Sequence, residues 1–381
     1  MSKEKKKIVK SDYLSNFTIV GEARVNDFTY KIDEKSSKSD WTYNALNLGV
    51  DCGEKYGTIY AELSGGYSAG KENVIFCHGK KEDGTDDFET QIQVVWEDRE
   101  NDEILEKIGD MCFITVGLQK TDKDKTFYKK FLSAYDAIAY VKEHLKDGMV
   151  VNVKGNLKYS TYNDKTQVRK TITSIALSKA EKENYSARFT QTILLDKDSA
   201  DLKEVDKDKS VLYVNARVLD YVKEVNGVEV KGQFPFNKQF EYELDLTNGE
   251  QCKKVYEKLF KVKKDVTQLT FEGDFIEGGA VVQTTWEDVP DDIKEFVEIG
   301  IFTKEDAIAK CSANGSKERR MILRKPYIKL VGDDKTPVVQ KFEEKYKESD
   351  LYLDYVYENK EEENESESSS ADDGLDWLSM L

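Results

Sequence analysis

Short runs in which apolar and polar side chains alternate follow one another along most of this chain. We predict strands over residues 16–25, 45–50, 58–63, 74–78, 88–96 and 111–117, because a half-buried strand alternates with a period of two. Glycines at Gly53, Gly65, Gly66, Gly79 and Gly84 separate these runs, as the turns of an antiparallel sheet require. Between Tyr128 and Leu145 the apolar residues recur every three or four positions, which predicts an amphipathic helix.

The clearest strand pattern follows that helix. Residues 146–162 and 168–177 form a hairpin over Asn163-Asp164-Lys165, with Val151, Val153, Gly155, Leu157 and Tyr159 on one face. A glycine in the middle of a strand, here Gly155, allows the bend that closes a barrel.

A second, looser copy of this order follows. Strands are predicted at 211–219, 240–246, 266–279 and 321–331, with a helix at 250–260 and a helical insertion near 291–310. Trp96-Glu97-Asp98 and Trp286-Glu287-Asp288 recur between the two copies. The pattern therefore predicts a mainly β protein of two related small barrels. We expect a basic N-terminal segment (1–11), a first domain (12–185), a second domain (186–334) and an acidic tail (335–381).

The charge and the cysteine content of the chain indicate which ligands and which cellular compartment fit this protein. The 381 residues carry a net charge of −16, but residues 358–381 hold nine acids and one lysine, so half of the excess lies in the tail. A negative total therefore does not exclude a polyanionic ligand. The five scattered cysteines favour a reducing compartment, and the chain shows neither a secretory signal nor a run long enough to span a membrane. We expect a cytoplasmic protein, in the host cytoplasm if it is viral, without a membrane partner.

One segment is basic within this acidic chain. Residues 117–182 contain fourteen Lys or Arg and seven Asp or Glu, a local charge of +7, with tyrosines and a phenylalanine among the cations. Cations pair with phosphates, and aromatic rings stack on unpaired bases with about 1–3 kcal/mol per base. The pattern predicts binding of single-stranded nucleic acid. The alternative is that the tyrosines pack inside the barrel and the lysines are ordinary surface charges.

The run Leu145–Lys165, followed by Val168–Ile175, resembles the bacterial and phage single-stranded-DNA-binding proteins. In that family a helix leads into a strand with a fixed glycine and then into a hairpin that carries a stacking aromatic residue and basic residues. The resemblance implies OB-like five-stranded barrels with capping helices, and a role in DNA replication, recombination and repair. The family's acidic tail recruits replication and repair proteins. This chain differs in carrying two barrels and in ending Trp377-Leu378-Ser379-Met380-Leu381.

Candidate site residues follow from the basic segment and the resemblance. The predicted nucleic-acid contacts are Lys129, Lys130, Lys154, Lys158, Tyr159, Tyr162, Arg169 and Lys170, with Trp41 and Tyr43 as further stacking candidates. The predicted partner-binding tip of the tail is Asp372, Asp373, Asp376, Trp377, Leu378, Met380 and Leu381. A tract with so little apolar surface is expected to be disordered, and we expect its acids to compete weakly with DNA for the basic face. The alternative is a solubilising tail that ends in a short packed helix.

Other chemistry is weakly indicated. The segment Gly65–Lys71 fits the first seven places of a phosphate-binding loop, but Glu72 stands where a Ser or Thr should hold magnesium. Cys77-His78 has no second ligand pair nearby in sequence, and nothing in the spacing places either histidine, His78 or His144, beside a nucleophile. We therefore predict no enzyme activity, no metal and no cofactor. The alternative functions are an OB-fold adaptor or structural module of a virus particle that does not bind DNA, and a nuclease or polymerase accessory factor.

Overall fold

The computed structural model describes residues 7–162, 165–225, 227–278, 286, 289, 291–298, 303–304, 307, 318–353 and 356. Strands make up most of the regular structure in these residues, and the helices are few and short. The prediction of a mainly β protein is therefore confirmed. In the described part of the chain no helix is both long and apolar enough to cross a membrane.

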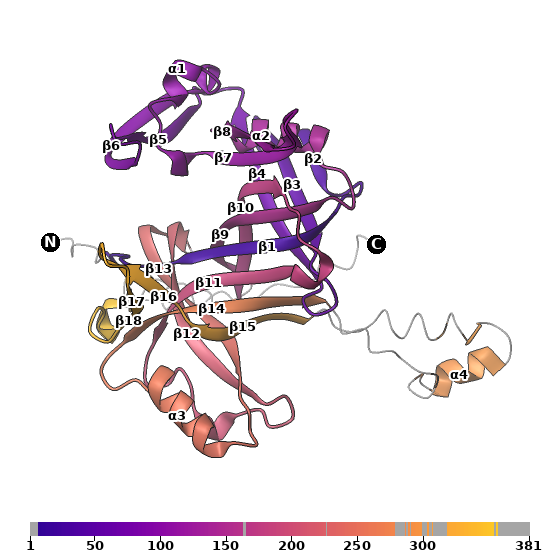
Figure 1. Cartoon of the computed structure of the whole chain (residues 1–381), viewed down its shortest axis with the longest axis vertical. Helices are drawn as coiled ribbons and strands as arrows, with labels where there is room; N and C mark the ends of the chain where they lie inside the picture. Colours follow the sequence, from indigo (N-terminus) through magenta and orange to yellow (C-terminus); the bar gives the residue numbers. More distant parts are fainter. Residues whose placement is uncertain are drawn as a thin grey trace, which may run out of the picture.

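Five strands of the first half close into a barrel (Figure 1): β1 (Ser15–Arg24), β3 (Trp41–Asp51), β4 (Thr58–Ser68), β9 (Val150–Tyr162) and β10 (Lys165–Leu177). β1 pairs antiparallel with β3 and β9, β3 with β4, and β9 with β10. A parallel contact between β4 and β10 completes the ring. Helix α2 (Ala134–His144) precedes β9, packs on β3 and β4, and begins where the Ser133 hydroxyl accepts the Tyr135 N–H. This strand order is that of the OB fold.

The second half repeats the same ring. Its strands are β11 (Ser186–Leu195), β12 (Val211–Val225), β13 (Val228–Glu243), β14 (Thr267–Gly278) and β15 (Glu318–Pro326). β11 pairs with β12 and β14, β12 with β13, and β14 with β15, all antiparallel, and β13 runs parallel to β15. Helix α3 (Gly249–Leu259) lies between β13 and β14 in the chain. The predicted pair of OB-like barrels with capping helices is thus confirmed.

The first strands of the two barrels join them into one sheet. β1 pairs antiparallel with β11, and Phe17 lies opposite Phe189. Phe17 also lies opposite Gly155 of β9, and Phe189 opposite Gly273 of β14. A Cβ atom at Gly155 would come within 2.8 Å of the Phe17 ring, and one at Gly273 within 2.2 Å of the Phe189 ring. The same phenylalanine-on-glycine contact therefore joins the first and fourth strands of each barrel.

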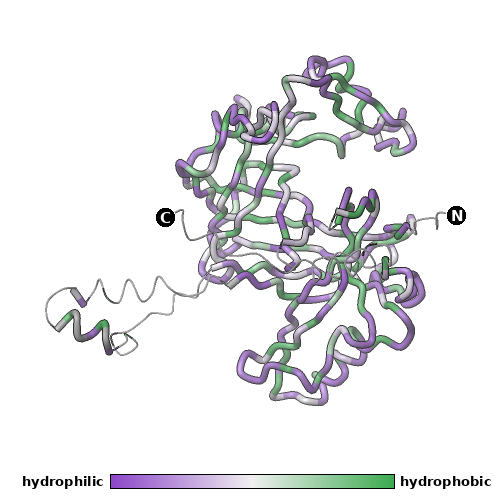
Figure 2. The backbone as a smooth tube through the Cα atoms, turned by 180° about the vertical axis from the view of Figure 1, so that it is seen from behind, coloured by the Kyte–Doolittle hydropathy of each residue, from purple (hydrophilic) through white to green (hydrophobic). Residues whose placement is uncertain are grey.

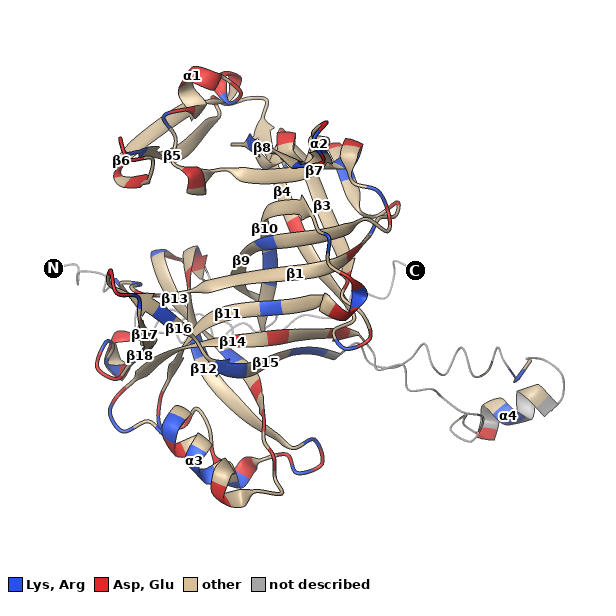
Figure 3. Ribbon diagram, viewed as in Figure 1, with Lys and Arg blue, Asp and Glu red and all other residues tan. Residues whose placement is uncertain are grey.

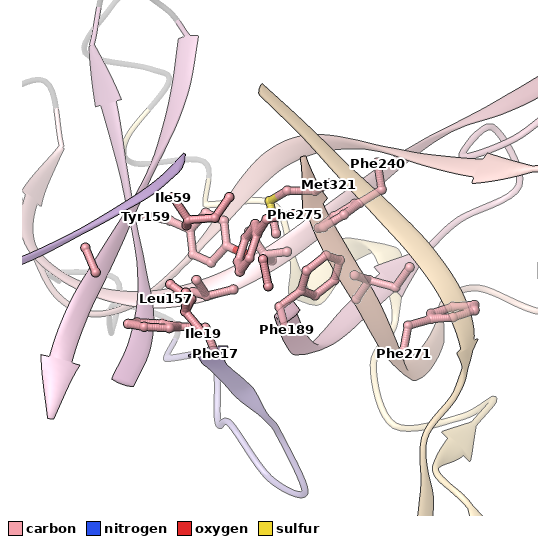
Figure 4. Packing of buried hydrophobic residues seen from close by; sticks show 14 of the residues in the cluster. Phe17, Ile19, Ile59, Leu157, Tyr159, Phe189, Phe240, Phe271, Phe275 and Met321 are labelled. Carbon is pink, nitrogen blue, oxygen red and sulfur yellow. The ribbon is translucent and has the colours of Figure 1, made fainter. Parts of the chain in front are cut away.

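One hydrophobic core runs through both barrels. Figure 4 shows Phe17, Ile19, Ile59, Leu157 and Tyr159 of the first barrel beside Phe189, Phe240, Phe271, Phe275 and Met321 of the second. Along the strands, hydrophobic residues that fill this core alternate with hydrophilic residues, which Figure 2 shows as green and purple bands. Burying side chains of this size contributes roughly 1.5–3 kcal/mol each. The barrels are therefore held as one body.

Residues 74–132, between β4 and α2, form a projection that we call the arm. It contains β5 (Val74–Lys80), β6 (Asp86–Val95), η1 (Trp96–Asp98), α1 (Asp102–Leu105), η2 (Asp110–Cys112), β7 (Ile114–Lys120) and β8 (Thr126–Phe131). β5 and β6 form a separate hairpin, whereas β7 pairs parallel with β10 and attaches the arm to the first barrel. A small core of its own, which includes Cys77, Ile108 and Phe113, stabilises the arm.

The remaining elements lie at the edges. They are β2 (Tyr30–Lys35), which pairs with β3, η3 (Lys182–Asn184), η4 (Leu202–Glu204), α4 (Asp291–Glu298), the hairpin of β16 (Ile328–Val331) and β17 (Thr336–Val339), β18 (Lys341–Phe342) and η6 (Glu348–Asp350).

Gly65 and Gly66 lie inside β4 and Gly79 inside β5, so their prediction as turn residues is wrong. One helix boundary is also wrong, and one strand was not predicted. The helix begins at Ala134 and not at Tyr128, because residues 126–131 form strand β8 against β7. β11 was not predicted, although it is almost wholly buried and pairs with three strands.

Candidate nucleic-acid interface

A cleft of about 720 Å³ lies between the two barrels. β3, β4 and β10 of the first barrel line one side of the cleft, and β13, β14 and β15 of the second line the other. Basic segments of β10 and β15 are visible in Figure 3. The charged residues that line the cleft are six cations, Lys165, Arg169, Lys170, Lys238, Arg319 and Arg320, and two acids, Glu62 and Glu277. We call this cleft the inter-barrel groove.

Lys170 and Glu277 form an ion pair across the groove floor. The Lys170 ammonium contacts the Glu277 carboxylate and lies 4.8 Å from the centroid of the Phe275 ring. Both side chains are nearly buried, with 8% and 11% of their surface exposed. Since Lys170 belongs to β10 and Glu277 to β14, the pair links the two barrels.

Lys238 on β13 lies beside this pair and is only partly exposed. Burial lowers its pKa, and the neighbouring positive charge of Lys170 lowers it further, against the opposite effect of Glu241. Among the described residues no carboxylate forms an ion pair with Lys238. A bound anion would offset the unfavourable free energy of burying the Lys238 charge and its repulsion from Lys170. This position therefore favours a phosphate-like ligand.

The open side of the groove carries an aromatic ring and two arginines. Tyr60 on β4 is 46% exposed. Arg169 is exposed and lies 3.6 Å from the Glu62 carboxylate, while Arg319 at the start of β15 is exposed and forms no ion pair with a described acid. The sixth cation, Arg320, is held by Glu241, with Nε 2.7 Å from the carboxylate. The groove therefore places the Tyr60 ring beside cations of two kinds. Arg319 forms no ion pair with a described acid, whereas Arg169 and Arg320 each contact a carboxylate.

The stacking candidates Trp41 and Tyr43 lie on the same face of the β3–β4 sheet as Tyr60. Tyr43 is opposite Gly66, Trp41 is opposite Ser68 and Tyr60 is opposite Gly49, so the three rings share one parity. Trp41 is 38% exposed and Tyr43 is partly exposed. From Trp41 to Gly49, the position opposite Tyr60, these rings span roughly 26 Å along the strands, at about 3.3 Å per residue.

The family model YorF matches residues 77–270. The chain belongs to the YorF family. No curated protein matches it.

Solved structures that are similar include two of the single-stranded DNA binding protein from Thermus aquaticus. The wild-type protein is 10% identical, with a TM-score of 0.31, and a deletion mutant is 11% identical, with a TM-score of 0.30. Each match covers 70% of this chain and 87% of the other.

Two of the candidate residues on the β9–β10 hairpin are not surface groups. Tyr159 is only 4% exposed; its hydroxyl bonds to Gln191, its N–H to Asp220, and its ring stacks on Phe236. Its prediction as a stacking residue is therefore wrong, because it belongs to the core between the barrels. Lys170 is likewise committed to its buried ion pair with Glu277, and it acts on a ligand only through its charge.

The other hairpin candidates lie at the surface. Tyr162 is 64% exposed and opposite Lys165 of the groove, and Lys154 is exposed on β9. Lys158 is opposite Arg169, but its ammonium lies 3.3 Å from Asp220 of the second barrel. The structure thus brings Arg169, Lys170 and Tyr162 to the groove or its end, and it directs Lys158 to a barrel–barrel contact.

Lys129 and Lys130 lie apart from the groove, on β8 of the arm. Lys129 lies over the rings of Phe131 and Tyr140, at 5.1 and 5.3 Å from their centroids. Lys130 pairs with Asp110 at 3.0 Å. β7 separates β8 from β10, so the structure does not bring these lysines to Arg169.

The candidate residues of the tail, Asp372, Asp373, Asp376, Trp377, Leu378, Met380 and Leu381, lie outside the described residues.

Sequence reasoning did not identify Tyr60, Lys165, Lys238, Arg319 and Arg320 as site residues. Tyr60 carried a usable signal, because it alternates with Ile59 and Ala61 and therefore points away from the core. Lys238, Arg319 and Arg320 come from the second half of the chain, outside the basic segment 117–182. Only the pairing of β13 and β15 beside β10 reveals their contribution.

Proposed function

We propose that this protein binds single-stranded DNA without regard to base sequence, and that the strand lies along the inter-barrel groove and the outer face of β3 and β4. The observation that carries the proposal is the groove lining, in which six cations face two acids and Lys238 has no described carboxylate partner. OB folds bind oligonucleotides on the face of their second and third strands, which here are β3 and β4.

The chemistry of the groove fits a single strand better than a duplex. Phosphates would pair with Lys165, Lys238 and Arg319, while Tyr60 offers its ring to an unpaired base. A base in a duplex is already stacked and has no free face for such a ring. Binding by phosphate pairing and stacking requires no hydrogen bonds to base edges, so it tolerates any sequence.

As part of the same proposal, the protein protects single strands during DNA replication, recombination or repair, with a phage as its source. The tail would recruit replication and repair proteins through its apolar tip. This part rests on the composition of residues 358–381 and on the resemblance of the first barrel's hairpin.

The test is a fluorescence anisotropy titration of the purified full chain with a labelled oligo(dT) of about thirty bases, enough for two OB folds of roughly 4–16 nucleotides each. Duplex of equal length is the control, and both are measured at low and moderate salt. We expect tight binding to the single strand that weakens steeply with salt. Absence of binding at low salt would contradict the proposal and favour a protein-interaction adaptor.

A further inference from the structure

The arm brings together a thiol, an imidazole and a carboxylate from three separate places in the chain. Cys112 Sγ of η2 lies 3.2 Å from Nδ1 of His78 on β5. His78 Nε2 lies 2.6 Å from Oδ1 of Asp86 at the start of β6. The backbone N–H of His78 also donates to Cys112 Sγ, at 3.3 Å. Cys112 Sγ also lies 3.8 Å from His78 Nε2, so the sulfur lies beside the imidazole ring. A nucleophile, a base and a group that orients the base are therefore in successive contact.

Asp86 fixes the roles of the two imidazole nitrogens. Its carboxylate accepts the Met111 N–H at 3.0 Å as well as the His78 contact, and these two hydrogen bonds hold its pKa below the ordinary Asp value. An ionised Asp86 requires the proton of neutral His78 to be on Nε2. Nδ1 is then the acceptor nitrogen, and it is the ring nitrogen nearer to the Cys112 sulfur. The close approach depends on Gly109, where a Cβ would lie 2.5 Å from the His78 ring.

A second thiol lies beside the first. Cys77 precedes His78 on β5, is 7% exposed and belongs to the small core of the arm, against which Cys112 packs. Burial, together with the neighbouring Cys112, raises the pKa of Cys77 to about 12, so Cys77 stays a thiol at neutral pH. Cys112, in contrast, is partly exposed to solvent.

The other two described cysteines lack this setting. Cys52 is buried in the main core, where burial raises its pKa, and Cys252 is buried and donates to the Asp245 carbonyl at 3.1 Å. Within the described residues, only Cys112 combines partial exposure with an imidazole acceptor and a backbone N–H donor. Cysteines that react with a reagent from solvent occupy such sites.

We propose that Cys112 is a peroxide-reactive thiol and that Cys77 resolves its oxidised form as a disulfide within the arm. His78 Nδ1 takes the Cys112 proton, and the thiolate attacks one oxygen of a hydroperoxide. An S–O bond forms, the O–O bond breaks, and the alcohol or water leaves with the proton from His78. The Cys77 sulfur then attacks Cys112. An S–S bond forms, and the hydroxyl leaves as water with the Cys77 proton. Two thiols are oxidised for each peroxide reduced.

This inference does not rest on nucleic-acid binding, since the residues belong to the arm and not to the groove. Its product would join η2 covalently to β5, where the Gly109 N–H already bonds to the His78 carbonyl at 3.0 Å. The disulfide would thus fix an existing contact.

The first test uses the wild-type full chain. Limited labelling with N-ethylmaleimide at neutral pH, followed by peptide mass spectrometry, compares the rate at each cysteine. We expect Cys112 to react about tenfold faster than Cys52 and Cys252. Treatment with hydrogen peroxide should then give a peptide pair joined through Cys77 and Cys112, lighter by two hydrogens and restored by dithiothreitol. Labelling no faster than at Cys52 and Cys252, or a disulfide that uses another cysteine, would overturn the proposal.

Variants separate the two steps. Cys77→Ser should stop the reaction at the sulfenic acid, which dimedone traps on Cys112. His78→Gln should slow peroxide oxidation of Cys112 by about tenfold, while Cys252→Ser, a matched loss of a thiol elsewhere, should change nothing. If His78→Gln disrupts the arm, Cys77 will become open to labelling. Equal oxidation rates with Cys77 still protected would refute the role of His78.

Discussion

Lys238→Gln gives a sharp prediction about the inter-barrel groove. The substitution removes one positive charge, keeps a polar side chain of similar length, and breaks no ion pair with a described carboxylate. Because burial and Lys170 already lower the pKa of Lys238, losing the charge should not destabilise the free protein. The effect should therefore fall on the bound state.

The size of the effect follows from the lining of the groove. Lys165, Lys238 and Arg319 form no ion pair with a described acid, and Arg169 is held at 3.6 Å by Glu62. Four phosphate contacts at a slope of about −0.7 each predict a salt slope of about −3 from the groove. Lys238→Gln should reduce its magnitude by about 0.7. Loss of one charged hydrogen bond, about 1.5–3 kcal/mol, should weaken binding at moderate salt by roughly tenfold or more.

The assay is anisotropy with labelled oligo(dT) at four or more salt concentrations. Lys254→Gln is the matched control: it makes the same charge change on α3, where the lysine is 74% exposed and away from the groove. Parallel salt plots for wild type and Lys238→Gln, or an equal effect of the two variants, would refute the phosphate contact at Lys238.

Three further predictions concern stability and the tail. Glu277→Gln should lower the unfolding free energy by about 3 kcal/mol in urea melts, because it leaves Lys170 buried without its partner; replacing both residues by apolar ones should recover most of the loss. Gly155→Ala should cost about 1–3 kcal/mol, because its Cβ would lie 2.0 Å from a backbone oxygen, whereas Gly249→Ala, where the site is open, should be neutral in the same melts. Deleting residues 372–381 should tighten oligo(dT) binding at low salt only and abolish capture of replication proteins; unchanged binding and capture would exclude a competing, recruiting tail.

The strand pattern was predictable wherever one face of a strand is buried. Val151, Val153 and Leu157 alternate with polar residues, and Gly155 marks the bend, so the barrel fold of the first half follows from local rules. β11 was missed although Ala187, Phe189 and Ile193 alternate with polar residues. The polar Gln191 stands on the buried face, and Leu194 beside Leu195 breaks the alternation at the end of the strand. Residues 128–131 were assigned to a helix because Phe131 continues the helical spacing, whereas their pairing with β7 makes them part of a strand.

The site was less predictable than the fold. The basic segment led to Arg169 and Lys170, but local sequence does not show that the second barrel supplies Lys238 and Arg319 across the groove. Tyr159 was assigned to the DNA-binding surface although it lies on the same face of β9 as the buried Val151 and Val153. The assignment followed from its aromatic side chain and not from its position in the alternation. The Cys112–His78 contact spans 34 residues and depends on how η2 packs on β5, so spacing along the chain could not reveal it.

The most direct test of the central claim is photo-cross-linking of the full chain to single-stranded DNA that carries 5-bromodeoxyuridine, mapped by peptide mass spectrometry. The account predicts cross-links to Tyr60 and to peptides of β10, β13 and β15, which excess unlabelled single strand removes and duplex does not. Cross-links confined to α3 or to the arm would contradict a strand bound between the two barrels.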